Sequence, residues 1–366
     1  MKRTLFCLFS IISLFSCTST GYKIEGVIED PLLNGQTVFI KERINRVWIP
    51  IDSVKIENGI FSFKGVCDSA RIAYLDCELP SGEKIRQAFV FENGNIMVKI
   101  DSASFIFSGT PQNDLLQTYL NEKKLFYINS EAFYKANNDS NQTKEQKAAF
   151  AAEMEKLSKE EVSIDLKYAL ANVNTIVGTH IFMSSFYAMS IAEKESVISQ
   201  MNDDTKKIKR IQEIIADIEI EKKTTKGQLF TDIKLPSLTG DSLALSSLVG
   251  KTDYVLVDFW ASWCAPCIQS LPEMKELYNI NKGKRLEILG VSLDDNEEAW
   301  KSAIAKHDLT WKHISDLQGW KCKGAKLYAV NSIPATVLID KSGKIVGRNM
   351  SIGEIESVIE KSTEKR

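Results

Sequence analysis

The chain has 366 residues, a net charge of −2 and a composition ordinary for a globular protein, with 44% hydrophobic and 26% charged residues. A chain of this length usually forms two or three domains. The near-neutral charge excludes a general electrostatic attraction for nucleic acid or anionic lipid, and no glycine-rich phosphate loop supports nucleotide binding.

The N-terminal segment predicts a signal peptide over residues 1–16. Two basic residues precede an apolar run over residues 5–15, which is too short to span a bilayer. The run ends in LFSC at Cys17, which resembles the lipobox of bacterial lipoproteins. This resemblance implies a diacylglyceryl group on Cys17 that anchors the protein to a membrane. Ordinary cleavage near Ser19 is the alternative. In both cases we expect the mature protein in the cell envelope, facing the periplasm.

Residues 17–110 predict a β-rich domain. Eight short segments of alternating apolar and polar residues are separated by turn pairs such as Asn58-Gly59 and Asn93-Gly94. This spacing is typical of a sandwich or a small barrel. The stretches IDSVKIENGIFSFKG and FVFENGNIMVKI resemble an N-terminal β-domain of unknown function in envelope lipoproteins, a resemblance that implies no activity. Cys67 and Cys77 lie on neighbouring segments, either as a disulfide or as two buried thiols.

Residues 111–226 predict a helical connector. Proline and glycine nearly vanish there, Glu, Lys, Ala and Leu dominate, and apolar residues recur at helical spacing. The pattern leaves several roles open: a connector, a dimerisation arm, a surface for a partner, or a solvated spacer.

Residues 227–366 alternate strands with helices, which predicts an α/β fold with a partly parallel sheet and helices on both faces. Within this region Cys264 and Cys267 form a CxxC pair where the apolar strand YVLVDFW passes into a helix. Such a junction lies at the carboxyl edge of a parallel sheet, where active sites collect.

The position of the two cysteines predicts thiol–disulfide exchange. Cys264 is expected at the N-terminus of the helix, whose partial positive charge stabilises a thiolate, so Cys264 is the predicted nucleophile. Cys267 lies one turn further in and is the predicted resolving thiol. Asp258, on the apolar strand before the pair, is the predicted buried proton acceptor with a raised pKa. The alternative for Asp258 is a strand-end carboxylate bonded to backbone.

The stretches VLVDFWASWCAPC and NSIPATVLIDKSGKIVG resemble the thioredoxin superfamily, and specifically its TlpA/ResA-like branch of envelope thiol–disulfide oxidoreductases. The resemblance covers about residues 227–366 and implies a thioredoxin fold. It also implies a cis peptide bond before Pro334, which faces the CxxC. Contacts with the bound substrate are expected from Trp263, Ala265, Pro266 and Ile333. Relatives often carry a glutamate where this chain has Ser270, which leaves Asp258 as the main buried acid.

Three other functions compete with thiol–disulfide exchange. A zinc site needs about four ligands, but the chain has no second CxxC and only three histidines, His180, His307 and His313, so we expect no metal. A peroxiredoxin-like peroxidase shares the entry hairpin, yet needs a Thr and a Pro before its single attacking cysteine, and this chain supplies neither. The third is a non-catalytic envelope binding or scaffold lipoprotein.

The sequence therefore predicts a lipid-anchored envelope oxidoreductase without a cofactor. Its expected partners are disulfide-containing envelope proteins and a membrane electron donor, with no role for nucleic acid. The resemblance suggests a reductant, for example in cytochrome c maturation. Cys322 is expected to be a half-buried helical thiol, with Lys321 and Lys323 beside it favouring the thiolate.

Overall fold

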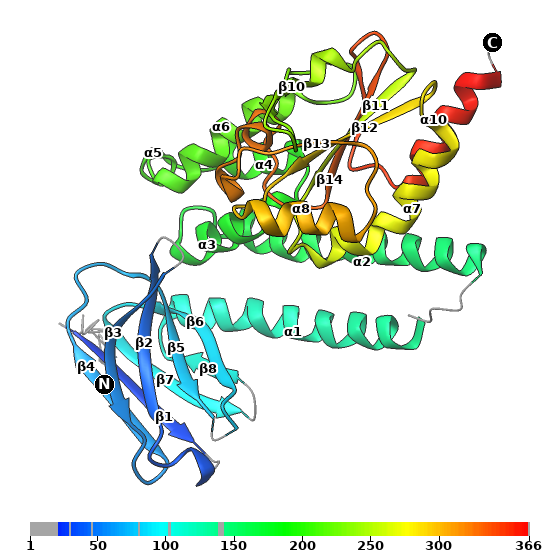
Figure 1. The fold of residues 1–366 in the computed structure, drawn as a ribbon. Coiled ribbons are helices and arrows are strands. Elements are labelled where there is room, and N and C mark those ends of the chain that lie inside the picture. Colours follow the sequence, from blue (N-terminus) through cyan, green and yellow to red (C-terminus); the bar gives the residue numbers. More distant parts are fainter. Residues whose placement is uncertain are drawn as a thin grey trace, which may run out of the picture. The chain divides into compact units, whose positions relative to one another are not determined.

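The computed structural model describes residues 21–28, 31–44, 47–79, 81–101, 104–137 and 143–364, so the predicted signal peptide and Cys17 lie outside it. The chain forms two units, Met1–Ser185 and Phe186–Arg366, and each is considered by itself (Figure 1). The division falls inside the predicted helical connector, whose helices are therefore shared between the two units. Within the described residues, none of the helices combines the length and the apolar character that crossing a membrane requires.

The first unit begins with a β-sandwich of two four-stranded sheets, ordered β4-β1-β7-β8 and β3-β2-β5-β6. The strands are β1 (Tyr22–Ile28), β2 (Thr37–Ile44), β3 (Val47–Lys55), β4 (Ile60–Gly65), β5 (Arg71–Glu78), β6 (Lys84–Phe91), β7 (Gly94–Asp101) and β8 (Ser104–Ser108). Aromatic rings join the sheets: Phe89 of β6 stacks on Phe107 of β8, with centroids 5.0 Å apart. The β-rich prediction for this region is confirmed.

The two cysteines of the sandwich are free and buried, which settles the alternative that the sequence left open. Cys77 lies on β5, in register with Val38 of β2, and burial raises the pKa of its thiol to about 11. Cys67 lies before β5, and its thiol donates to the carbonyl oxygen of Ser69 at 2.9 Å.

Three helices complete the first unit: α1 (Pro111–Asn137), α2 (Lys144–Ala171) and α3 (Ile176–Ser185). The first turn of α1 is fastened to the sandwich, because the Asn113 amide both donates to and accepts from the backbone of Val90. Further along, Lys123 of α1 bonds Glu161 and Asp165 of α2, and this buried ion cluster holds the two helices together.

The second unit contains a five-stranded sheet ordered β13-β12-β11-β14-β15. Its strands are β11 (Tyr254–Trp260), β12 (Leu286–Ser292), β13 (Lys312–Ile314), β14 (Ala335–Asp340) and β15 (Ile345–Arg348), preceded by the hairpin of β9 (Lys234–Pro236) and β10 (Ser242–Ala244). The strands β11, β12 and β13 run parallel, whereas β14 and β15 are antiparallel. The mixed sheet confirms the predicted α/β architecture.

Helices cover both faces of this sheet. They are α7 (Ala265–Asn281), α8 (Glu297–Lys306), α9 (Lys323–Leu327) and α10 (Ile352–Glu364). Crossovers between parallel strands are right-handed, so α7 and α8 share one face. There α10 packs against α7 (Figure 1). On the opposite face α9 lies so close that a Cβ on Gly324 would stand 3.1 Å from Val291 of β12.

Three further helices belong to the second unit: α4 (Ile191–Ser199), α5 (Asp203–Lys206) and α6 (Lys209–Lys223). Arg348 of β15 reaches the end of α6, donating to the hydroxyl of Thr224 and, at 2.7 Å, to the carbonyl oxygen of Tyr328. The second unit therefore begins before residue 227. It includes α4, α5 and α6, which the sequence assigned to the helical connector.

Candidate active site

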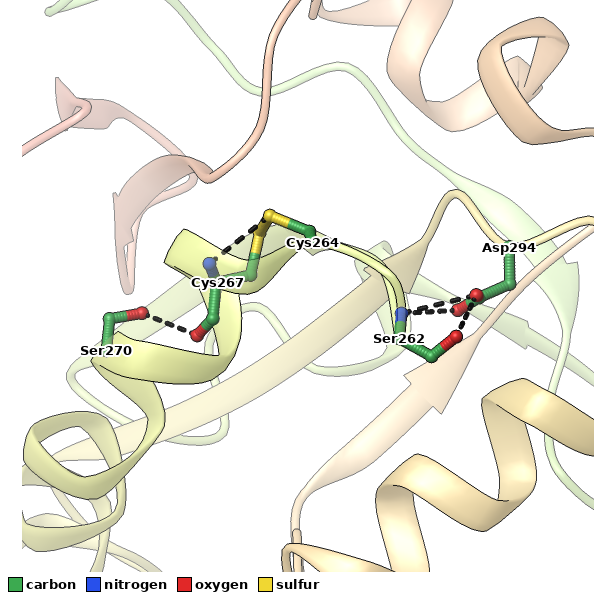
Figure 2. The surroundings of a disulfide bond; sticks show 5 residues. All are labelled: Ser262, Cys264, Cys267, Ser270 and Asp294. Carbon is green, nitrogen blue, oxygen red and sulfur yellow. Dashed lines mark hydrogen bonds between the residues drawn. A yellow bond between two sulfur atoms is a disulfide. The ribbon is translucent and has the colours of Figure 1, made fainter. Parts of the chain in front are cut away.

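Cys264 and Cys267 form a disulfide at the start of α7 (Figure 2). Cys264 is the N-cap of the helix, and its Sγ accepts a hydrogen bond from the backbone N–H of Cys267 at 3.2 Å. Pro266 stands in the first turn, where the missing N–H costs no hydrogen bond. This end of the helix carries a partial positive charge, so it stabilises a thiolate on Cys264 once the disulfide is reduced.

Asp258 occupies the middle of β11, between β12 and β14, and is 3% exposed. Burial alone raises the pKa of its carboxyl to about 7, because desolvation disfavours the charged form. A carboxyl with this pKa exchanges protons near neutral pH, as a proton acceptor for a thiol must. The role of Asp258 in catalysis stays a prediction.

The loop before the disulfide is braced by Asp294, a residue that sequence reasoning missed. Asp294 follows β12 and is fully buried. Its carboxylate accepts from the backbone N–H of Ser262 at 3.0 Å, from the hydroxyl of Ser262 at 2.5 Å and from the hydroxyl of Ser292 at 2.7 Å (Figure 2). The sequence feature that could have pointed to Asp294 is its place just after a parallel strand, where polar residues lie at the same sheet edge as the CxxC.

Replacing Asp294 with alanine is expected to lower the free energy of unfolding by about 2–3 kcal/mol, because buried donors on Ser262 and Ser292 lose a charged acceptor. Urea denaturation of the oxidised protein measures this loss. Asp295→Ala is the matched control, since its exposed side chain lies one residue away. Equal stability of Asp294→Ala and the control would show that the brace contributes nothing.

The predicted cis-proline is present: the Ile333–Pro334 bond is cis. Ala335, the next residue, pairs with Phe259 at the end of β11, so Pro334 lies at the sheet edge from which the loop to Cys264 departs. Around this edge Ala265 and Pro266 are exposed, and Ile333 is half-buried. Trp263 is 52% exposed and packs against Trp320, with ring centroids 6.1 Å apart. These residues offer the exposed apolar surface expected of a substrate contact, a role that stays a prediction.

Ser270 stands one turn after Cys267 on α7, and its hydroxyl donates to the carbonyl oxygen of Cys267 at 2.9 Å (Figure 2). This short side chain bonds its own helix and adds no charge near the disulfide. Because Ser270 is not an acid, Asp258 stays the predicted proton acceptor for the Cys264–Cys267 pair.

The structure corrects the expectation for Cys322. Its thiol is fully buried between the 3₁₀ turn Gly319–Lys321 and α9, whereas the sequence suggested a half-buried group. Burial raises the pKa of this thiol to about 11, which outweighs any attraction from the neighbouring lysines. Cys322 is therefore poorly suited to thiolate chemistry.

A metal site would need several ligating side chains close together. Across the part of the chain that the structure describes, no three His, Cys, Asp or Glu residues gather in a ligating arrangement. The three histidines belong to different elements: His180 to α3, His307 to the end of α8 and His313 to β13.

A disulfide-forming CxxC at a helix N-terminus, after the central strand of a mixed sheet and beside a cis-proline, defines a redox domain of the thioredoxin fold. Residues 226–348 match the AhpC/TSA family, and residues 22–116 match a domain of unknown function named DUF4369. The thiol–disulfide oxidoreductase ResA of Oceanobacillus iheyensis is 32% identical over 166 residues, which are 45% of this chain and 78% of that protein. The chain therefore belongs to the ResA-type thiol–disulfide oxidoreductases.

The chain is also similar to a second ResA protein and to a solved structure. ResA of Bacillus cereus is 36% identical over 120 residues, which are 33% of this chain and 66% of that protein. Among solved structures, the C-terminal domain of a putative thiol-disulfide oxidoreductase from Bacteroides thetaiotaomicron is 33% identical. It covers 39% of this chain and 99% of that one, with a TM-score of 0.37.

Proposed function

We propose that the protein reduces disulfides of partner proteins in the cell envelope by thiol–disulfide exchange. The observation that carries this proposal is the Cys264–Cys267 disulfide at the N-terminus of α7. A cysteine pair that forms a disulfide at this position can exchange two electrons with the dithiol or disulfide of another protein. Membership of the ResA-type oxidoreductases supports the same chemistry.

The reaction runs in two displacements. The Cys264 thiolate attacks a sulfur of the partner's disulfide, forming a mixed disulfide and releasing one partner thiolate, which takes a proton from solvent. Asp258 then accepts the proton of the Cys267 thiol, and the new thiolate attacks Sγ of Cys264. The second partner thiolate leaves and is protonated. The partner's disulfide has become two thiols, and Cys264 and Cys267 have become a disulfide.

The proposed direction of electron flow, from this protein to its partners, rests on the resemblance to the TlpA/ResA-like branch, which suggests a reductant. In an oxidising envelope a reducing dithiol must be recharged after each turnover, which requires a membrane electron donor. A client with two cysteines that must be reduced, such as apocytochrome c before haem attachment, fits this scheme.

The reduction potential of the Cys264–Cys267 couple tests the direction. We expect a value near about −270 mV, as in thioredoxin, after equilibration with defined thiol buffers and alkylation of the free cysteines. A value near about −120 mV, typical of the oxidant DsbA, would contradict the reductant and favour an oxidase.

The lipid anchor is tested through Cys17. In the full-length protein expressed in a bacterial host, Cys17→Ser is expected to move the mature chain from the membrane to the soluble fraction, because the acyl chains are lost. Labelled fatty acid should enter the unaltered protein and not the variant. Cys7→Ser is the control, since Cys7 belongs to the predicted signal peptide. Equal membrane association of Cys17→Ser and the unaltered protein would argue against lipidation.

The match to the AhpC/TSA family keeps peroxide reduction as a second candidate function. Hydrogen peroxide turnover by the reduced protein distinguishes the two. We expect peroxide turnover far slower than reduction of a protein disulfide, because Trp260, Ala261, Ser262 and Trp263 replace the Thr and Pro that a peroxidase packs before its cysteine.

A further inference from the structure

Three residues form a row across one face of the second unit's sheet. Asp258 of β11 is in register with Gly290 of β12, and Gly290 is in register with His313 of β13. Residues in register on neighbouring strands point to the same face. The carboxyl of Asp258 and the imidazole of His313 therefore project from the same face, with only a hydrogen atom on Gly290 between them.

The imidazole of His313 lies over Gly290. A Cβ on Gly290 would stand 2.4 Å from Nδ1 of His313 and 3.1 Å from Nε1 of Trp260, so no other residue fits there without moving the ring. Trp260 and Trp311 flank the imidazole, with centroids 5.6 and 5.8 Å from it. The imidazole therefore reaches over Gly290 toward β11, the strand that carries both Trp260 and Asp258.

The imidazole of His313 is buried without hydrogen bonds to the described residues. His313 is 2% exposed, and neither of its ring nitrogens has a hydrogen-bond partner among the described residues; the same holds for Nε1 of Trp260. A buried polar group left without a partner is destabilising, so a phenyl ring would fill this space more favourably. An ionised Asp258 next to the ring supplies a reason for a polar side chain here.

We propose that His313 is a positioning residue of the redox site, whose ring N–H stabilises the ionised carboxylate of Asp258 across Gly290. His313 thereby acts on the proton exchange between Asp258 and Cys267 without touching the reacting sulfur atoms. The inference rests on the proposed function for its catalytic meaning, but the coupling between the two side chains is measurable without an activity assay.

Few other titratable groups face this row within the described chain. α7 brings the two active-site cysteines and Tyr278, whose hydroxyl donates to Glu287 at 3.1 Å. The buried residues of α8 are Trp300, Ala303 and Ile304, those of α10 include Ile355 and Ile359, and β14 places Thr336 in register with Asp258. None of these buried side chains is charged. The carboxylates on β12 and just beyond it are Glu287, which bonds Tyr278, and the buried Asp294, which bonds Ser262 and Ser292. Burial lowers the pKa of His313 to about 3, so the ring is neutral near pH 7 and keeps one N–H to donate.

The test follows the Asp258 carboxyl carbon by NMR from pH 4 to 10 in the oxidised full chain. In His313→Phe we expect its titration midpoint to rise by about 1 pH unit or more, because a carboxylate that loses a donor is harder to ionise. His313→Gln, which keeps a donor, should restore the midpoint of the unaltered protein. His307→Gln at the end of α8 is the matched control and should change nothing.

Two outcomes would overturn the proposal: an unchanged or lowered midpoint in His313→Phe, or equal shifts in His313→Phe and His313→Gln, which would indicate a structural effect. If His313→Phe fails to fold, the coupling is tested in the unaltered protein by a second NMR measurement. Its imidazole ¹⁵N signals should change with the midpoint of Asp258, and flat signals would refute the coupling. Disulfide reduction by the unaltered protein is measured separately, so a failure there counts against the proposed function and not against this coupling.

Discussion

Replacing Cys264 with serine is expected to abolish reduction of a protein disulfide such as that of insulin, with a loss of at least about 10³-fold. The serine hydroxyl is not ionised at neutral pH, so the helix N-terminus no longer holds a nucleophile. Cys267 cannot substitute for it, because Cys267 lies inside the first turn of α7 and not at the N-cap, where the helix stabilises a thiolate. The rate of insulin precipitation in the presence of a dithiol donor measures the loss.

Cys267→Ser should behave differently from Cys264→Ser. It is expected to accumulate a mixed disulfide through Cys264, because the first displacement proceeds and the second has no thiol. Non-reducing electrophoresis detects this adduct. Cys322→Ala is the matched control, a buried thiol of the same unit that should leave activity intact. Full activity of Cys264→Ser would favour the non-catalytic scaffold over the oxidoreductase.

Replacing Asp258 with asparagine is expected to stabilise the oxidised protein at pH 8 but not at pH 4. Burial raises the pKa of this carboxyl from 3.8 to about 7, so the fold favours its protonated form. The stability that this group contributes is fully present below the unfolded-state pKa and is lost as pH rises through 7. A shift of this size corresponds to about 4 kcal/mol, which is the expected difference in stabilisation between pH 8 and pH 4.

Urea denaturation of both proteins at the two pH values measures this effect, and comparing two pH values removes any constant cost of the buried amide. Asp295→Asn, an exposed carboxylate in the same unit, should show no such difference. Because asparagine accepts no proton from Cys267, the same variant should also release its partner more slowly. A stabilisation independent of pH would mean that Asp258 is ionised in the fold.

The essentials of the redox site could be predicted from the sequence because they follow from short-range patterns. Cys264, Pro266 and Cys267 lie within one turn of a helix, and Asp258 lies on the strand just before it. A carboxyl among apolar residues of a buried strand is conspicuous in a sequence. The cis bond before Pro334 was different, because only the resemblance to thioredoxins pointed to it.

What the sequence could not provide depends on register and on contacts distant in the chain. Asp294 braces Ser262 because two parallel strands end at the same level, and nothing local indicates which strands are neighbours. His313 became significant only once the register placed Gly290 between it and Asp258. Likewise α6 is helical by its own periodicity, but the hydrogen bond at its C-terminal end comes from Arg348, 124 residues after Thr224.

The burial of the three free thiols has a practical consequence. Cys67, Cys77 and Cys322 are all withdrawn from solvent, and every other cysteine in the described part of the chain belongs to the active disulfide. In an oxidised sample, the cysteines that the structure describes should therefore react with a thiol reagent only as fast as the fold opens. After reduction, Cys264 at the N-cap of α7 is expected to react first, because the helix N-terminus stabilises its thiolate. The reactivity of the described cysteines toward a thiol reagent therefore reports whether the Cys264–Cys267 pair is oxidised or reduced.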